Sequence, residues 1–121
     1  PLDLVVDDAS HMLEPSMASF NVLFPRLRPG GIYVIEDWSW EHYGERTAGP
    51  EFMADKVTGF ARLVLCATIV NAYAPEVIAR VVSSRGIAVI YRGESTLEPE
   101  GFDITELLGE RGSQLLRGHE F

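Results

Sequence analysis

The sequence predicts an α/β fold in which a parallel strand–helix–strand unit is followed by a strand hairpin. Two short apolar runs, Leu2–Asp7 and Ile32–Ile35, each lead into acidic residues and are separated by an amphipathic segment. Strands joined through a helix run parallel, because the crossover returns the chain to the same end of the sheet. Two later β-branched runs, Val77–Ser83 and Ile87–Arg92, flank the turn residues 84–86, which favours an antiparallel pair.

The first strand and the helix after it have the clearest signals. The run Leu4–Val6 is uninterrupted and apolar, which is typical of a strand covered on both faces. Pro15 suits a first helical turn. Apolar residues then recur at helical spacing, namely Met17, Phe20, Leu23, Phe24 and Leu27. We expect Pro25 to distort or end this helix early and residues 29–31, Pro-Gly-Gly, to stop the segment before the second strand.

Later segments are predicted in less detail. The polar and aromatic stretch Trp38–Gly49 reads as a loop at the carboxyl end of the second strand, where α/β proteins bind substrates. Glu51–Tyr73 predicts a long helix, although Gly59 weakens it. Beyond Gly93 we expect a poorly determined tail over residues 94–121, with a short helix within Ile104–Leu116.

Composition excludes several classes of function. The chain has 121 residues, enough for one small domain, with 18 acidic and 10 basic residues and a formal net charge of −8. This balance argues against nucleic acid as a partner, since phosphates require Lys and Arg. The single cysteine, Cys66, excludes an intrachain disulfide and is expected to be a buried small side chain. The apolar stretch Leu63–Ala72 is shorter than the roughly 20 residues of a membrane span, so we expect a cytoplasmic protein without a membrane partner.

The start of the chain is unusual for a domain. It opens on Pro1, without an initiator methionine, and is already a predicted strand at Leu2. Domains commonly begin with a less ordered segment. We therefore expect the chain to be a fragment of something longer.

Acidic residues follow both predicted parallel strands. Asp7 and Asp8 close the first strand, and Glu36 and Asp37 close the second. Neighbouring strands lie about 4.8 Å apart and ligands bind beyond their carboxyl ends, so these acids can converge on one cation. Oxygen ligands without cysteine favour Mg²⁺, with Ca²⁺ or Mn²⁺ as alternatives. The competing interpretation is that each acid caps the turn or helix after it. Glu36 and Asp37 can share a site only where the strand ends, because successive strand residues point to opposite faces.

One histidine lies close to these acids in sequence. His11 follows Asp8 by three residues and can accept a proton near neutral pH, although a surface or capping role fits it equally. His42 is a candidate for substrate contact, and His119 is expected to be incidental. Three further aromatic residues of the loop either line an acceptor pocket or pack the loop onto the core: Trp38, Trp40 and Tyr43.

Residues 3–40, DLVVDDASHMLEPSMASFNVLFPRLRPGGIYVIEDWSW, closely resemble a stretch of class I S-adenosylmethionine-dependent methyltransferases. Within these they are most similar to the macrolide-sugar O-methyltransferases of the mycinamicin and macrocin type. The shared pattern is a strand ending in Asp-Asp-Gly-Ser-His, a Ser-Phe-x-x-Leu-Phe helix and Pro-Gly-Gly-x-Tyr-Val-Ile-Glu-Asp. Ala9 stands where that pattern has glycine, and Ala tolerates fewer backbone conformations. The likeness is dense over residues 2–37, looser over 87–93 and absent after Glu94.

The resemblance implies a specific architecture. The chain would be the C-terminal half of a Rossmann-like seven-stranded methyltransferase sheet, with strands in the order 4-5-7-6, an antiparallel last pair and flanking helices. Residues 1–121 would form a partial domain with the metal and acceptor side. The cofactor-binding half, with its glycine-rich loop, would lie upstream of Pro1. Strand four would then leave a bare apolar edge, so we expect a homo-oligomer.

The resemblance also implies an activity. It is that of a metal-dependent O-methyltransferase, which moves a methyl group from S-adenosylmethionine to a small-molecule hydroxyl, such as one on a natural-product sugar. By position, Asp8, Glu36 and Asp37 would ligate Mg²⁺, Asp8 would also contact the cofactor, and His11 would be the base. The cation lowers the pKa of the acceptor hydroxyl; this fragment should be inactive alone. Two alternatives remain open, a metal-dependent hydrolase on an α/β scaffold and a non-catalytic oligomerisation module.

Overall fold

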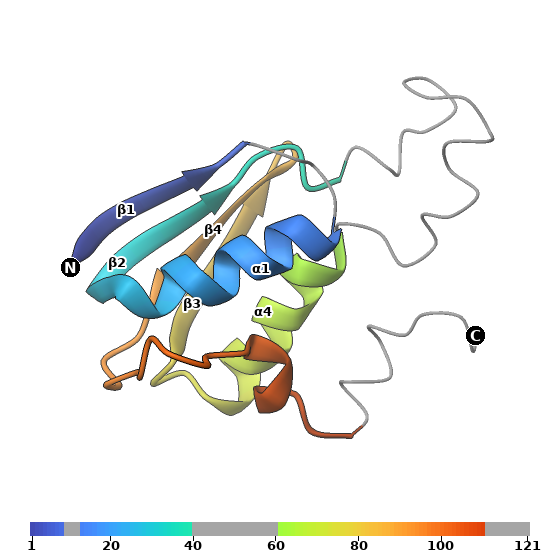
Figure 1. The fold of residues 1–121 in the computed structure, drawn as a ribbon. Helices are drawn as coiled ribbons and strands as arrows, with labels where there is room; N and C mark the ends of the chain where they lie inside the picture. Colours follow the sequence, from blue (N-terminus) through green and yellow to red (C-terminus); the bar gives the residue numbers. More distant parts are fainter. Residues whose placement is uncertain (9–12, 40–60, 111–121) are drawn as a thin grey trace.

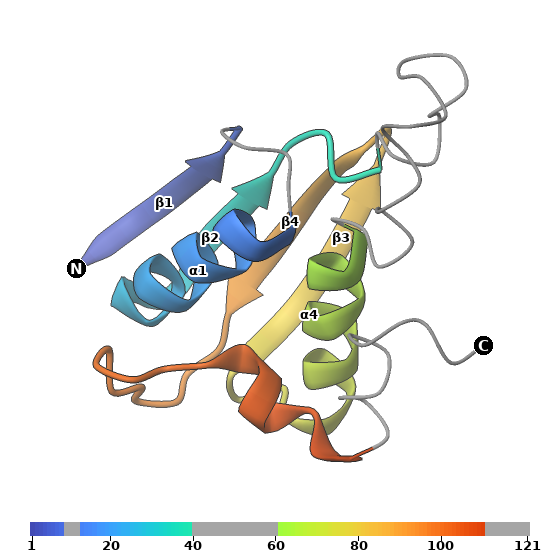
Figure 2. The same ribbon diagram turned by 45° about the vertical axis from the view of Figure 1, so that its right-hand side comes forward.

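A mixed four-stranded sheet packs against two helices in the computed structural model, which describes residues 1–8, 13–39 and 61–110. The strands are β1 (Leu2–Asp7), β2 (Leu27–Ile35), β3 (Ile78–Ser84) and β4 (Ile87–Arg92). They lie in the order β1-β2-β4-β3, with β1 parallel to β2 and the other neighbours antiparallel. Helices α1 (Leu13–Leu23) and α4 (Ala61–Tyr73) both cross one face of this sheet (Figures 1 and 2).

This arrangement confirms the expected α/β fold. The strand–helix–strand unit β1-α1-β2 is parallel, and the last two strands form an antiparallel hairpin. The turn of that hairpin places Arg85 and Gly86 at φ +53° and +81°, values that match the right-handed twist of the two strands. The spatial order of the strands agrees with the predicted 4-5-7-6 arrangement, whereas their numbering within a seven-stranded sheet stays a prediction.

The core lies between the helices and one face of the sheet. Alternating positions of β2 and β4 supply its sheet side, and Tyr33, Ile35 and Ile90 are fully buried there. Phe20 of α1 lies with its ring edge-on to Tyr33, with 4.8 Å between the ring centroids. From α4 come four buried apolar residues that recur at helical spacing, namely Leu63, Val64, Ala67 and Val70. The part of the predicted helix before Ala61 lies outside the described residues.

The chain between α1 and β2 differs from its prediction at one point. As expected from Pro25, the α-helix ends at Leu23 and continues as a short 3₁₀ turn. Residues 29–31, however, lie inside β2 and do not stop the chain before it. The stretch of β1 from Leu2 to Leu4 pairs with the longer stretch of β2 from Leu27 to Ile32. The extra residues form a bulge that Gly30 permits by adopting φ +79°.

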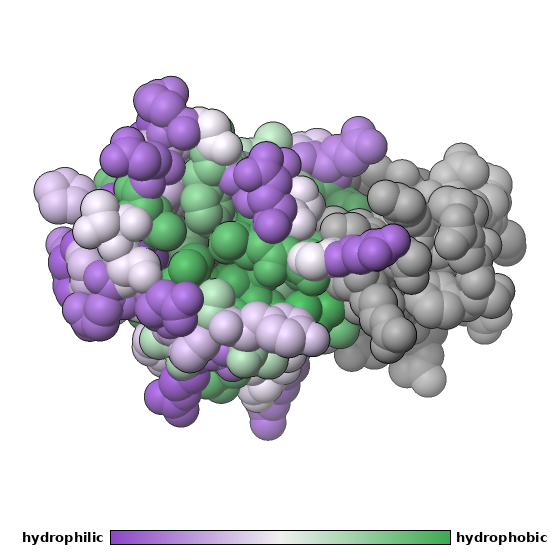
Figure 3. All heavy atoms as spheres, turned by 90° about the horizontal axis from the view of Figure 1, so that it is seen from below, coloured by the Kyte–Doolittle hydropathy of each residue, from purple (hydrophilic) through white to green (hydrophobic). Residues whose placement is uncertain are grey.

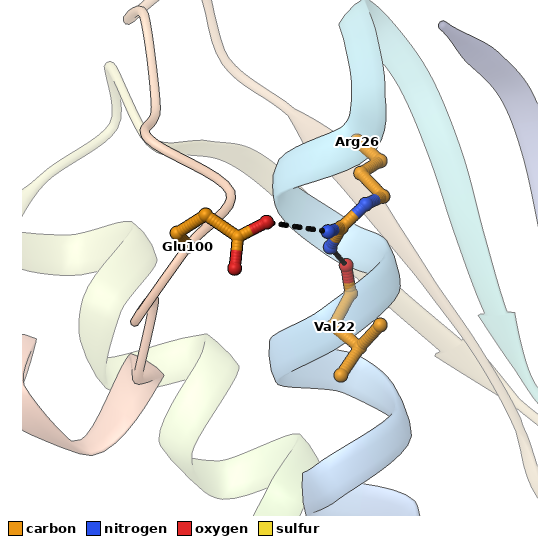
Figure 4. A network of polar contacts seen from close by, with 3 residues as sticks. All are labelled: Val22, Arg26 and Glu100. Carbon is orange, nitrogen blue, oxygen red and sulfur yellow. Dashed lines mark hydrogen bonds and ion pairs between the residues drawn. The ribbon is translucent and has the colours of Figure 1, made fainter.

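The segment after β4 folds back over the helices. Ile104, in the 3₁₀ helix η3 (Ile104–Leu107), is fully buried in the core, and its backbone N–H donates to Asn21 Oδ1 of α1 over 2.9 Å. Nearby, the Arg26 guanidinium donates to the carbonyl oxygen of Val22 and pairs with Glu100 over 3.3 Å (Figure 4). These contacts attach the first part of the predicted tail to α1 and to the 3₁₀ turn that follows it.

The other face of the sheet carries apolar side chains that no described helix covers. Strand pairing places two rows on this open sheet face, which consists of Leu4, Ile32 and Tyr91 together with Val6, Val34 and Val89. Leu4 and Val6 are each 53% exposed. On a different side of the molecule, seen from below the view of Figure 1, hydrophobic residues also gather in the middle of the surface, with hydrophilic ones around them (Figure 3). In the described ranges, no helix has the length and apolar character needed to cross a membrane.

Candidate functional site

The carboxyl ends of β1 and β2 lie level with each other. Asp7 and Ile35 are paired across the two strands, and the Glu36 backbone N–H donates to the Asp7 carbonyl oxygen over 3.0 Å. Asp8 and Glu36 therefore leave neighbouring strands at the same edge of the sheet (Figure 1). This is the edge at which open α/β sheets bind their ligands.

The chain turns sharply after β2. The strand ends at Ile35, and Asp37 adopts φ +57°, a left-handed conformation that departs from the strand. Glu36 and Asp37 are therefore not held on opposite faces of a continuing strand, which was the condition for their sharing a site. Trp38 is partly buried against the core. Of its two predicted roles, the structure therefore shows packing onto the core rather than lining of an acceptor pocket.

Asp7 and Asp8 occupy different environments. Asp7 is 8% exposed and belongs to the helix-covered face, where Tyr33 lies on the neighbouring strand. Burial raises the pKa of Tyr33 above its ordinary value, and the negative charge of Asp7 raises it further. Asp8 is exposed and lies directly after the end of β1. The proximity of Asp7 to Tyr33 was not predicted from the sequence. The available signal was the spacing of Tyr33 and Ile35, which places both residues on one face of their strand.

The predicted ligands share an edge without forming a closed cluster. Asp8 and Asp37 are exposed and Glu36 is half-buried. Within residues 1–8, 13–39 and 61–110, no three His, Cys, Asp or Glu side chains gather closely enough to hold a metal ion. His11 lies outside the described residues. The candidate contacts His42, Trp40 and Tyr43 lie outside them too, as does His119, which was expected to be incidental. The ligand and base assignments therefore stay predictions.

The donor chemistry at this edge suits a hard cation. All three predicted ligands are carboxylates, which are the oxygen donors that Mg²⁺ prefers. Cys66 does not supply a soft thiolate ligand at this edge, because it is buried in the core on α4. Burial, with a smaller contribution from Asp103, raises the pKa of its thiol to about 12. The expectation that Cys66 is a buried small side chain is confirmed.

Comparison with known proteins identifies relatives over part of the chain. No protein-family model matches it. The demethylmacrocin O-methyltransferase of Streptomyces fradiae is 53% identical over 47 residues, covering 36% of this chain and 12% of that enzyme. The mycinamicin VI 2''-O-methyltransferase of Micromonospora griseorubida is 51% identical over 47 residues, with the same coverage. The expected resemblance to the macrolide-sugar O-methyltransferases is confirmed.

Solved structures extend the likeness to the fold. The MycE methyltransferase of the mycinamycin biosynthetic pathway, in complex with Mg and SAH, matches with a TM-score of 0.54 and 29% sequence identity, covering 77% of this chain. A further MycE structure, which also contains mycinamycin VI, matches with the same TM-score and 28% identity. The sheet and helices thus match part of a methyltransferase fold. The chain spans 26% of the MycE chain and 12% of the curated relatives named above.

Proposed function

We propose that this chain is part of a metal-dependent O-methyltransferase that uses S-adenosylmethionine and Mg²⁺. The acceptor is a small-molecule hydroxyl, and a natural-product sugar is the proposed class. The observation that supports this most directly is the pairing of Asp7 with Ile35, which brings Asp8 and Glu36 to one edge of the sheet. The likeness to MycE, whose solved complex contains Mg and SAH, points to the same chemistry.

Each predicted residue has a distinct proposed role. Asp8, Glu36 and Asp37 hold the cation, and Asp8 also contacts the cofactor. When bound, Mg²⁺ supplies positive charge that lowers the pKa of an acceptor hydroxyl. His11 takes the proton of that hydroxyl as general base, which requires it to be neutral at the working pH. The turn at Asp37 contributes by presenting two successive carboxylates at the end of a single strand.

The remaining features of the proposal concern the whole protein. Residues 1–121 form the metal and acceptor side of a partial domain, with 94–121 as its C-terminal tail, and the cofactor's glycine-rich loop belongs to the other half. The chain alone is therefore proposed to be inactive. We further propose a homo-oligomer located in the cytoplasm.

A titration of the full-length protein tests this function. Isothermal titration with Mg²⁺ and with S-adenosylmethionine should detect binding of both, and D8N and E36Q should weaken Mg²⁺ binding by at least tenfold. D3N is the matched control, because Asp3 lies at the other end of β1 and is exposed. His11→Ala should retain Mg²⁺ binding and lose methyl transfer by about 10²- to 10⁴-fold.

The two alternatives give different results in the same experiment. A hydrolase would cleave its substrate with Mg²⁺ in the absence of S-adenosylmethionine. An oligomerisation module would bind neither ligand, and the double substitution of Asp8 by Asn and His11 by Ala would change nothing but local stability. Methyl transfer that survives that double substitution would reject the catalytic roles proposed for both residues.

A further inference from the structure

Asp7 is a carboxylate in an environment that normally excludes charge. Its side chain is 8% exposed and lies on the helix-covered face of the sheet. A buried carboxylate is costly unless hydrogen-bond donors or opposite charges stabilise it. Asp7 belongs to neither the predicted ligands nor the predicted base, so its burial calls for a separate explanation.

Tyr33 is placed to stabilise this carboxylate. It is fully buried on β2 and pairs with Val5, two residues before Asp7 on the same face of β1. The ring of Phe20 packs edge-on against it, which fixes the direction of the phenol. A phenol hydroxyl is a hydrogen-bond donor at neutral pH, and burial, followed by the charge of Asp7, raises the pKa of Tyr33 above its ordinary value. Among the described residues its hydroxyl oxygen is buried without an assigned hydrogen-bond partner, so its proton is available to a neighbouring acceptor.

The backbone of Asp7 connects this buried pair to the candidate metal site. Its carbonyl oxygen accepts the Glu36 N–H over 3.0 Å, and the next residue along β1 is Asp8. Asp7 thus lies between two of the proposed ligands, with its side chain in the core and its carbonyl in the last bond of the β1–β2 pairing. A rotation of Asp7 would move both ligands.

We propose that Asp7 and Tyr33 form a positioning pair, in which the buried phenol holds the Asp7 carboxylate and thereby sets the spacing of Asp8 and Glu36 for a divalent cation. Neither residue of the pair touches the cation or the substrate. The inference rests on the proposed function, because it concerns how that same metal site is arranged. Substituting a residue that orients a metal ligand without contacting the metal commonly changes metal affinity by about 10- to 100-fold.

Two conservative substitutions in the full-length protein test the pair. Tyr33→Phe removes only the hydroxyl, and its matched control is Tyr91→Phe, on the open sheet face, where the ring lies under the Arg80 guanidinium 5.3 Å away. Asp7→Asn removes the charge and keeps an acceptor oxygen. Its control is Asp3→Asn, which loses an exposed ion pair with Arg28. Circular dichroism would establish that each variant is folded.

The decisive readout is the dissociation constant for Mg²⁺, or for Mn²⁺ followed by electron paramagnetic resonance. Y33F should raise it about 10- to 100-fold, D7N should raise it less than Asp7→Leu does, and Y91F and D3N should stay within about twofold of wild type. At saturating Mg²⁺ the kcat of Y33F should approach that of wild type, because excess cation compensates for poorly placed ligands.

The possible failures are separable. If wild type binds Mg²⁺ and Asp8→Asn abolishes binding, an unchanged Mg²⁺ dissociation constant in folded Y33F and D7N overturns the positioning pair and leaves the proposed function intact. If wild-type protein binds no divalent cation, the proposed function and the positioning pair are both rejected. A loss of kcat in Y33F that excess Mg²⁺ does not restore also contradicts the pair.

Discussion

The backbone N–H of Trp38 donates to the carbonyl oxygen of Gly86 over 3.1 Å. This bond joins the turn after β2 to the turn of the β3–β4 hairpin. Gly86 itself has φ +81°, and a Cβ at this position would lie 3.2 Å from Ser39 Oγ. The segment that carries Asp37, a proposed ligand, is therefore supported by residues more than forty positions later in the chain.

Gly86→Ala should weaken both the fold and the candidate metal site. A left-handed conformation costs a residue with a Cβ about 1 to 2 kcal/mol, and the added methyl group would also press on Ser39. Urea denaturation should show a loss of unfolding free energy of that size. In the full-length protein the Mg²⁺ dissociation constant should rise, because the displaced turn carries Asp37.

Gly101→Ala separates the two effects. Gly101 has φ +76°, close to that of Gly86, and a Cβ there would meet nothing within 4 Å. It should lose a similar unfolding free energy of about 1 to 2 kcal/mol while leaving Mg²⁺ affinity unchanged. Equal Mg²⁺ affinities in the two variants would show that the Gly86 turn does not support the site.

The sequence predicts those elements of the fold that local pattern determines. β1 and β4 have the predicted bounds, because short apolar runs between acidic or turn residues leave little choice of register. The Pro-Gly-Gly run at residues 29–31 resembled a stop and is instead a bulge. Its neighbour in the fold is β1, since a Cβ on Gly31 would lie 3.1 Å from the Asp3 carbonyl oxygen. Such a contact cannot be derived from residues 29–31 alone.

The candidate site was predictable only in part, for a similar reason. Acidic residues after two parallel strands predict a shared edge, and the pairing of Asp7 with Ile35 places them there. The sequence did not indicate which of the successive acids is buried. That depends on which face the helices cover, and Tyr33, which lies beside Asp7 on that face, is distant from it in sequence. His11, outside the described residues, stays a prediction.

Cys66 should be unreactive in the folded chain. Its thiol is buried, with the pKa raised to about 12 from an ordinary value of 9.0, chiefly by burial. Because the thiolate is the reactive form, the native chain should not react with a disulfide reagent at pH 8, whereas the urea-unfolded chain should react completely. The chain has one cysteine, so the signal has a single source, and rapid native labelling would contradict the burial of Cys66.

The same thiol makes stability depend on alkaline pH. Below pH 9 both the folded and unfolded states keep the proton, and the contribution of Cys66 is constant. Between pH 9 and about 12 the unfolded state releases the proton while the folded state retains it, so unfolding becomes easier as the pH rises. The slope should approach about 1.4 kcal/mol per pH unit. Cys66→Ala should flatten the curve between pH 9 and 10, below the range in which Tyr33 adds its own effect.

Asn21→Ala should destabilise the attachment of η3 to α1. The Asn21 side-chain oxygen accepts the backbone N–H of Ile104, a fully buried residue, and losing that acceptor costs about 1 to 3 kcal/mol. Glu100→Gln is the matched control, because its ion pair with Arg26 is largely exposed and such pairs contribute about 0 to 1 kcal/mol. Urea denaturation should rank Asn21→Ala as the larger loss, and the reverse order would contradict the hydrogen bond as the main link.

The open sheet face should cause the chain to self-associate when it is studied alone. Its apolar side chains form contiguous rows, whereas soluble proteins mostly expose hydrophobic residues singly. Burying this apolar surface stabilises association by about 25 cal/mol per Å². Light scattering over a range of concentrations should show a rising average mass. Val6→Lys should lower it by placing a charge in one of the apolar rows, on the edge strand β1. Val22→Lys is the control, since Val22 of α1 is also 53% exposed but lies away from the sheet. Equal association of the two variants, or a monomeric wild-type chain at every concentration, would exclude this face as the cause.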